Sequence, residues 1–330
     1  MAELFTEQRG CGRRLLARTA QLLGNRRRTR LRGRRWLGFA CLVPVMAVGC
    51  GIATAPAQPT TITPISGAHI EQFNLTSDGF QRTYFLQIPN AAGQLPLVIV
   101  LHGADSSPQG AYSTSNFAQI GVDRGWLVAY PAGYEGTWNE GAGGTPARRA
   151  GVNDVAFIEA MIKQIEAHYA VNRAEIVASG ISNGALMVEL LGCQLAGTID
   201  LIVPVEGELP ASVSPTCHPS KPISVLEVHG TADPTIPYGG GHFDGVGGGT
   251  TVLSAPASVA RWAKLNSCAT KPSVTNVPGR KLTTYAACRD DVLTRLLTVI
   301  GGAHVFPPDI GQLVNAVLGQ ASRRASPKST

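Results

Sequence analysis

The sequence predicts an α/β fold with a doubly wound, mostly parallel sheet and helices on both faces. From residue 97 to residue 319, short apolar runs typical of strands alternate with segments typical of helices. This alternation indicates a parallel sheet built from strand–helix–strand units. A glycine-flanked turn at residues 180–184 joins one such strand to one such helix. About 250 residues are enough to form one buried core, so we expect a single folded domain.

The turn at residues 180–184 carries Ser182 in the order Gly-Ile-Ser-Asn-Gly. An apolar, β-branched segment precedes the turn at 175–178, and an Ala/Leu/Met-rich segment follows it at 185–191. A strand, a Gly-x-Ser-x-Gly turn and a helix together are the layout of a nucleophile elbow. The two glycines permit a turn that a Cβ atom would obstruct, and the helix N-terminus favours nearby negative charge. We therefore predict that Ser182 is a nucleophile.

An aspartate and a histidine follow Ser182 in the chain order that this architecture requires. Asp233 stands just past the strand expected at 222–230, and His304 follows the strand expected at 292–300 on a glycine-rich loop. We expect His304 to take the Ser182 proton and return it to the leaving group. Asp233 would fix the imidazole tautomer and stabilise the imidazolium.

Other histidines and acidic residues fit these roles less well. His229 ends a strand but precedes the Asp233 turn, so we expect it to be a buried, hydrogen-bonded partner there. The remaining candidates are expected at surface, linker, capping, turn or loop positions: His69, His168, His218, His242, Asp154, Asp200 and Asp244.

The candidate oxyanion site begins with the continuous apolar run at 95–101, which is typical of a strand covered on both faces. Gly103 follows this strand and lets the chain turn toward the elbow. We expect the backbone N–H groups of Ala104 and Asn183 to bind the oxyanion. One such donor typically stabilises the transition state by about 3 kcal/mol.

Several short blocks occur along the chain in this order: Leu101-His102-Gly103, Val128-Ala129-Tyr130-Pro131, Trp138-Asn139, 152–158, 180–184, 229–234 and Gly301-Gly302-Ala303-His304. They resemble, in the same order, blocks of the polyhydroxybutyrate depolymerase-like esterases, which overlap the feruloyl and acetylxylan esterases and include bacterial lipoprotein esterases. The resemblance covers roughly residues 70 to 310. It implies an α/β-hydrolase fold and a carboxylic ester hydrolase without metal or cofactor, with Ser182, Asp233 and His304 in the triad positions.

Three residues are candidates for the substrate pocket. Trp138 and Asn139 lie in the glycine-rich loop after Tyr130-Pro131 and would line the acyl or alcohol pocket, although a structural tryptophan is an open alternative. Phe306 stands near the position where the family usually has a Trp-Pro pair after its histidine. The glycine-rich segment 239–249 is expected to be a mobile loop beside the Asp233 turn.

The positive charge of the chain is concentrated at its N-terminus. The whole sequence has 28 basic and 22 acidic residues, a net charge of +6. Residues 1–35 hold 11 arginines and two glutamates, which leaves 17 basic and 20 acidic residues in 36–330. Because the excess of positive charge belongs to the leader, we expect no nucleic-acid partner.

Residues 1–50 are predicted to be a signal peptide. The apolar segment 36–49 follows a charged region and is too short to span a bilayer comfortably. Its end, Met46-Ala47-Val48-Gly49-Cys50, resembles a bacterial lipobox, with Cys50 as the lipidated first residue of the mature chain. The alternative is a plain signal peptide cleaved nearby. We therefore expect an exported protein, either lipid-anchored at the outer face of the membrane in the bacterial cell envelope or secreted.

The mature chain divides into three parts. Residues 51–66 are rich in Pro, Thr and Ala and are expected to be a flexible tether. Residues 67–320 would form the catalytic domain, which starts with a hairpin at 73–88, and residues 321–330 a disordered tail. Few residues remain after 322 for the separate substrate-binding domain that the family's polymer depolymerases often carry. We therefore do not expect binding to an insoluble polyester.

Four cysteines remain after the leader and Cys50. They allow three pairings, and proximity in the sequence favours Cys193–Cys217 and Cys268–Cys288. Each bond would contribute about 3 kcal/mol in the chain-entropy model. No His/Cys group has the close spacing of a zinc site, so we expect no metal.

These observations together predict an exported serine esterase that acts on a small-molecule or polymer-derived carboxylic ester through an acyl-enzyme. The acyl group would be short-chain, polyhydroxybutyrate-type, feruloyl or acetyl. Two alternatives stay open on the same fold. One is a catalytically silent envelope lipoprotein that binds a glycan or lipid, and the other is an acyltransferase.

Overall fold

The computed structural model describes residues 61–325, with side chains as far as residue 320. The predicted signal peptide, the lipidation site Cys50 and most of the predicted tether lie outside the described residues. Among the residues described, none of the helices has the length and apolar character needed to cross a membrane.

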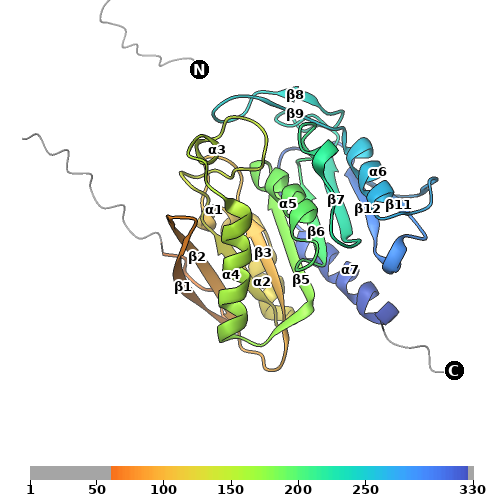
Figure 1. Cartoon of the computed structure of the whole chain (residues 1–330). Helices are drawn as coiled ribbons and strands as arrows, with labels where there is room; N and C mark the ends of the chain where they lie inside the picture. The colour runs from red at the N-terminus through yellow and green to blue at the C-terminus, as the bar shows by residue number, and fades with distance from the viewer. Residues whose placement is uncertain (1–60, 326–330) are drawn as a thin grey trace, which may run out of the picture. The chain divides into compact units, whose positions relative to one another are not determined.

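Ten strands form one twisted sheet in the order β1-β2-β4-β3-β5-β6-β7-β12-β11-β10 (Figure 1). Their bounds are β1 Ala68–Ser77, β2 Phe80–Pro89, β3 Leu95–Leu101, β4 Leu127–Pro131, β5 Val171–Ile181, β6 Leu201–Val205, β7 Ser224–Gly230, β10 Ser273–Val277, β11 Arg280–Tyr285 and β12 Thr294–Val299.

The six central strands, from β4 to β12 in the sheet order, run parallel to one another. An antiparallel hairpin, β1–β2, continues the sheet at one side, as expected for the entry hairpin. A second antiparallel hairpin, β10–β11, continues it beyond β12 and was not anticipated from the sequence. The predicted doubly wound, mostly parallel sheet is therefore confirmed.

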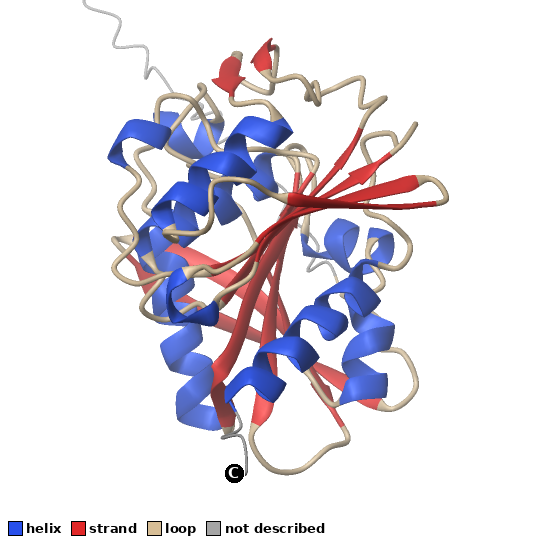
Figure 2. Cartoon of the chain, turned by 90° about the vertical axis from the view of Figure 1, so that its right-hand side faces the viewer, coloured by secondary structure: helices blue, strands red, loops and turns tan. Residues whose placement is uncertain are grey.

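Helices cover both faces of this sheet (Figure 2). Phe157 and Trp262, from α4 and α6, join one core cluster with residues of α5, whereas Phe117 and Val314, from α2 and α7, join the other. The helices are α1 Pro108–Thr114, α2 Phe117–Arg124, α3 Pro146–Arg149, α4 Asp154–His168, α5 Asn183–Gln194, α6 Ala255–Leu265 and α7 Ile310–Ala325, with short 3-10 turns at Ser214–Thr216 and Arg289–Asp291.

Local sequence explains why these segments form where they do. The five residues from Leu97 to Leu101 in β3 are fully buried, as expected for a strand covered on both faces. Helix α4 begins after Asn153, whose side chain accepts a hydrogen bond from the Ala156 N–H at 3.0 Å. Its buried residues, including Phe157, Met161 and Ile165, recur at helical spacing and face the sheet.

Two boundaries differ from the sequence-based prediction. Helix α7 continues to Ala325, whereas a disordered tail was expected from residue 321. Residues 239–249 were expected to form a mobile loop, but they contain strand β8 (Gly241–Phe243), which pairs with β9 (Thr250–Val252) as a two-stranded ribbon. Both segments are rich in small or polar residues, so composition alone hid their regular structure.

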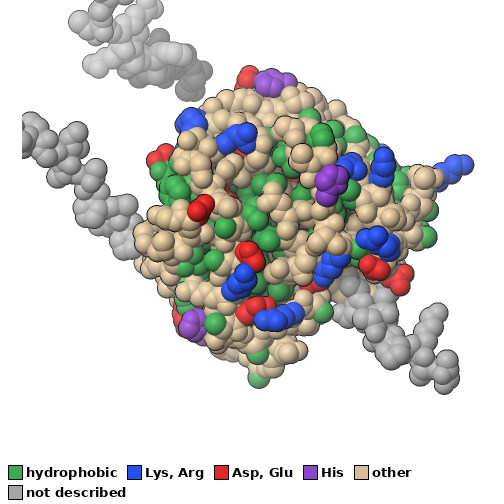
Figure 3. All heavy atoms as spheres, in the orientation of Figure 1, with side chains coloured by type: hydrophobic (Ala, Val, Ile, Leu, Met, Phe, Trp, Pro, Cys, Tyr) green, Lys and Arg blue, Asp and Glu red, His purple; other side chains and the backbone are tan. Residues whose placement is uncertain are grey.

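The disulfide bonds connect Cys193 with Cys217 and Cys268 with Cys288, as sequence proximity favoured. On the face shown in Figure 3, acidic and basic side chains are interspersed among neutral ones. This agrees with the near balance of charge after residue 35.

Candidate active site

Three polar side chains meet at the carboxyl edge of the sheet. Ser182 stands between β5 and α5, Asp233 follows β7, and His304 follows β12. The three strands are parallel, so their carboxyl ends share one edge. The His304 Nδ1 atom lies 2.6 Å from Asp233 Oδ2, and His304 lines the same pocket as Ser182. The fold thus brings together three residues that lie far apart in the sequence.

The turn at Ser182 has the strained backbone of a nucleophile elbow, with φ 60° and ψ −125°. A Cβ atom on Gly180 would lie 2.7 Å from the Gly184 carbonyl oxygen, and one on Gly184 would lie 2.7 Å from that of Leu101. The two glycines are therefore required by close packing of the backbone around the serine.

Asp233 is held as a carboxylate by several donors. Its Oδ1 atom accepts hydrogen bonds from the N–H groups of Thr235 at 2.7 Å and Ile236 at 3.0 Å. Burial alone would raise its pKa, but hydrogen bonds from His229, His304 and the Thr235 N–H hold the pKa of Asp233 well below its usual range. Asp233 is therefore anionic at neutral pH and can orient an imidazole.

The expected oxyanion donors, Ala104 and Asn183, line the pocket beside Ser182. A buried histidine, His102, organises the turn before Ala104. Burial lowers the pKa of His102 to about 4, so its ring is neutral. The ring Nδ1 lies 2.7 Å from the Gly103 carbonyl, and Nε2 accepts the Gly133 N–H at 3.0 Å. In the sequence, His102 belongs to a block that resembles the esterase family, but no role was predicted for its side chain.

Trp138 and Asn139 are not among the residues that line the pocket, and for Trp138 the open alternative, a structural tryptophan, is confirmed. Trp138 is fully buried, and its indole N–H donates to the His102 carbonyl at 2.9 Å while its backbone N–H donates to Asn183 Oδ1 at 2.8 Å. Asn139 donates its side-chain amide to the Val152 carbonyl and its backbone N–H to Asp154. Both residues support the loops behind the site.

Phe306 also lies outside the pocket. It is 5% exposed and packs edge-on against Phe117, with ring centroids 6.4 Å apart, in the core cluster that contains α7. Its position in the sequence near His304 suggested a substrate contact. The chain turns after His304, however, so the aromatic ring packs into the core.

The pocket has a volume of about 550 Å³. Its wall includes residues of the β8–β9 ribbon, so the glycine-rich segment that was expected to be a mobile loop contributes to the site. Residues that define the pocket are Ala104, Glu140, Ser182, Asn183, Phe243 and His304.

Glu140 is a pocket residue that sequence analysis missed. It is 1% exposed, and its Oε2 atom has no hydrogen-bond partner within the described part of the chain. Burial raises the pKa of Glu140 to about 7, although a hydrogen bond from the Asn183 side chain opposes this rise. The carboxyl group therefore changes charge near neutral pH beside an expected oxyanion donor.

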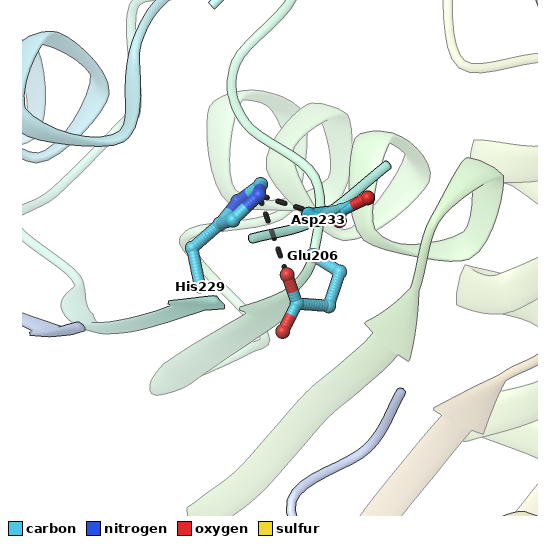
Figure 4. Close-up of side chains that lie close together, drawn as sticks. All are labelled: Glu206, His229 and Asp233. Carbon is cyan, nitrogen blue, oxygen red and sulfur yellow. Dashed lines mark ion pairs between the residues drawn. The ribbon is translucent and has the colours of Figure 1, made fainter. Parts of the chain in front are cut away.

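A second group of buried ionisable residues surrounds His229, which lies close to Glu206 and Asp233 (Figure 4). Its Nε2 atom lies 3.3 Å from Glu206 Oε2 and 3.4 Å from Asp233 Oδ2, while Nδ1 contacts the Glu208 carboxylate. Sequence analysis expected a buried, hydrogen-bonded histidine here, and this is confirmed. Its acidic neighbours were missed because they lie in apolar sequence that predicts only core.

Glu206, His229 and Asp233 offer ligand atoms within 4.8 Å of one another, so we tested whether they fit a cation. A histidine that binds a metal ion must be neutral and have a free lone pair. Burial opposes a charge on His229, but hydrogen bonds and ion pairs with its acidic neighbours raise its pKa to about 10, so both nitrogens carry protons at neutral pH. His229 therefore forms an ion pair with Asp233 beside the Glu206 carboxyl and does not fit the role of a metal ligand.

The sheet topology and the helices on both of its faces define an α/β-hydrolase fold. A solved acetyl xylan esterase from Aspergillus awamori has the same fold, with a TM-score of 0.58 over 76% of this chain and 99% of its own. The identity over this alignment is 15%, so the likeness concerns the fold alone.

Sequence comparison confirms the resemblance to feruloyl and acetylxylan esterases. Feruloyl esterase B of Piromyces equi is 32% identical over 216 residues, which are 63% of this chain and 39% of that protein. The bifunctional acetylxylan esterase/xylanase XynS20E of Neocallimastix patriciarum is 26% identical over 151 residues, 45% of this chain and 21% of that protein. The chain thus spans well under half the length of these two relatives. No protein-family model matches it.

Proposed function

We propose that this protein is a serine esterase that hydrolyses carboxylic esters through an acyl-enzyme, with Ser182, His304 and Asp233 as its triad. One observation carries the proposal. The His304 Nδ1 atom contacts Asp233 Oδ2 at 2.6 Å in a pocket that Ser182 also lines. An imidazole oriented in this way presents its other nitrogen for proton transfer.

The proposed reaction has two halves. In the first, Ser182 Oγ attacks the ester carbonyl carbon while His304 Nε2 accepts the hydroxyl proton, which it then gives to the leaving alcohol. In the second, His304 activates a water that hydrolyses the acyl-enzyme and frees Ser182. The N–H groups of Ala104 and Asn183 stabilise the oxyanion in both halves. Asp233 stabilises the imidazolium as it forms.

The relatives suggest the class of ester. Two of them are named as a feruloyl esterase and an acetylxylan esterase, so we propose feruloyl, acetyl or other short acyl esters of a carbohydrate or small alcohol as substrates. A pocket of about 550 Å³, with Phe243 and Leu186 in its wall, has room for such acyl groups.

We also propose export, with Cys50 as a lipid-anchored first residue. Two disulfide bonds support this proposal because such bonds persist in oxidising compartments. Metabolic labelling with an alkyne fatty acid should mark the wild type and spare Cys50→Ala. Equal labelling of the two proteins would exclude Cys50 as the anchor.

The activity is tested with p-nitrophenyl acetate and butyrate. We expect turnover by the wild type, loss of about 10⁴-fold or more in kcat in Ser182→Ala, and no loss in Ser113→Ala, whose hydroxyl is exposed on α1. A folded wild type without turnover would contradict the proposal and favour a silent binding protein. Adding a carbohydrate alcohol distinguishes a hydrolase from an acyltransferase. A hydrolase releases the free acid, whereas an acyltransferase forms the ester of the added alcohol.

A further inference from the structure

His229 is a buried histidine that the triad does not include but that touches its aspartate. It is the next-to-last residue of β7, and its side chain is fully buried. Asp233 Oδ2 is shared between two imidazoles, His304 Nδ1 at 2.6 Å and His229 Nε2 at 3.4 Å. Figure 4 shows the contact with His229. The charge on His229 therefore acts directly on the carboxylate that orients His304.

Acceptors surround both nitrogens of the His229 ring. Nδ1 contacts the Glu208 carboxylate, and Nε2 lies 3.0 Å from the Ile236 carbonyl and 3.3 Å from Glu206. The Ile236 carbonyl can only accept, so Nε2 carries a proton, and an ionised Glu208 is satisfied by a second proton on Nδ1. These contacts favour the doubly protonated ring, in agreement with its raised pKa.

The other elements packed against His229 add no second cation among the residues described. Tyr238 packs edge-on against the ring, with centroids 5.7 Å apart, and its hydroxyl is hydrogen-bonded to Thr298 of β12. Glu206 is 1% exposed and has φ 52°, and its carboxyl accepts the Gly230 N–H. Burial raises the pKa of Glu206 to about 8, so this residue is largely neutral at pH 7.

We propose that His229 is a positioning residue for the triad: a buried imidazolium, held by the Glu208 carboxylate and the Ile236 carbonyl, that keeps Asp233 anionic and opposes a second positive charge on His304. This proposal rests on the proposed esterase function. Because His229 already places a positive charge beside Asp233, an imidazolium at His304 is less stable in the free enzyme.

The test is the pH profile of kcat/KM for p-nitrophenyl butyrate, measured for the wild type, His229→Gln and the control His69→Gln. His69 is exposed on β1, remote in the fold from the triad. Glutamine keeps one donor and a similar size but removes the charge. In His229→Gln we expect the acid limb to move upward by about one pH unit, which lowers kcat/KM by up to about tenfold at pH values below the acid limb of the wild type. The loss should be less than about threefold at pH 9.

A merely structural role for His229 would lower kcat/KM at all pH values and leave the acid limb in place. A folded His229→Gln protein with an unmoved acid limb would overturn the proposal. His69→Gln should match the wild type throughout, and an equal shift in that variant would also overturn it.

A second measurement covers the case in which His229→Gln does not fold. Long-range ¹H–¹⁵N spectra of the ¹⁵N-labelled wild type report the protonation of each imidazole, and we expect one buried ring with both nitrogens protonated at pH 8. A neutral His229 ring at that pH would overturn the proposal. A wild type without esterase activity would instead defeat the proposed function, and the spectra would still decide the charge on His229.

Discussion

The backbone N–H of Trp138 donates a hydrogen bond of 2.8 Å to the side-chain oxygen of Asn183. The indole of the same tryptophan donates to the His102 carbonyl, two residues before Ala104. One fully buried residue therefore braces both segments that carry the expected oxyanion donors. The placement of these two N–H groups depends on a residue that does not line the pocket itself.

We expect Trp138→Phe to fold and to lose about tenfold in kcat with little change in KM. Phenylalanine keeps an aromatic ring in the core but leaves the His102 carbonyl without its donor, so the Ala104 turn is held less firmly. Steady-state kinetics with p-nitrophenyl butyrate measure the effect. An unchanged kcat in the folded variant would contradict the bracing role.

The elbow glycine Gly184 provides a prediction with a matched control. In Gly184→Ala the new Cβ would lie 2.7 Å from the Leu101 carbonyl oxygen, and we expect destabilisation by about 1–3 kcal/mol and lower activity. Gly319 lies within α7, where a Cβ would have no heavy atom within 4 Å, so Gly319→Ala should stabilise by about 0.5–1 kcal/mol. Urea unfolding measures the free energy of unfolding of both variants. If the two substitutions change this free energy in the same direction, the packing argument is wrong.

The raised pKa of Glu140 predicts an alkaline limb in kcat. Burial raises this pKa to about 7, so the carboxyl becomes an anion above that pH. Negative charge beside Asn183 opposes the developing oxyanion, and we expect kcat of the wild type to fall above pH 7. In Glu140→Gln the fall should be absent, whereas Glu159→Gln, an exposed position on α4, should keep it. If the alkaline limb of kcat persists in Glu140→Gln, the limb belongs to another group and the prediction is wrong.

Stability should decrease as the pH rises from about 5 to 10. The folded-state pKa values of Glu206, about 8, and His229, about 10, both exceed their unfolded values of 4.5 and 6.5. The folded state therefore binds these protons more tightly, and the stability they contribute is lost as pH passes through the folded values. Each unit of pKa difference corresponds to about 1.4 kcal/mol.

Urea unfolding at pH 5, 7 and 9 measures this dependence. Glutamine can accept the Gly230 N–H as Glu206 does, so Glu206→Gln should flatten the decline between pH 6 and 8. A wild type that becomes more stable over the same range would show that the cluster does not titrate in this way.

The parts predicted well from the sequence are those where local pattern and topology agree. The turn around Ser182 has its own glycine signature, and Asp233 and His304 each follow a strand. Since those strands are parallel neighbours, their ends share one edge of the sheet. The nearby cysteine pairs could also be assigned, because short loops left little choice of partner.

The site predictions that were wrong, and the site residues that were missed, depend on side-chain direction or on contacts between distant parts of the sequence. Trp138 was a pocket candidate because of its glycine-rich loop and Phe306 because it follows His304, but their rings pack into the protein. Glu206 and Glu208 follow β6, and their role emerges only when the sheet places them beside His229 of β7. No periodic pattern indicates such a cluster, because its members come from segments that lie apart in the sequence.

The most direct test of the central claim is covalent labelling of the intact folded chain by a fluorophosphonate, mapped by mass spectrometry. We predict one adduct per chain, on Ser182, and a labelling rate that falls about 10³-fold or more in His304→Gln, because the serine then lacks its base. No adduct on Ser182 of the wild type, or equally fast labelling in His304→Gln, would contradict the account.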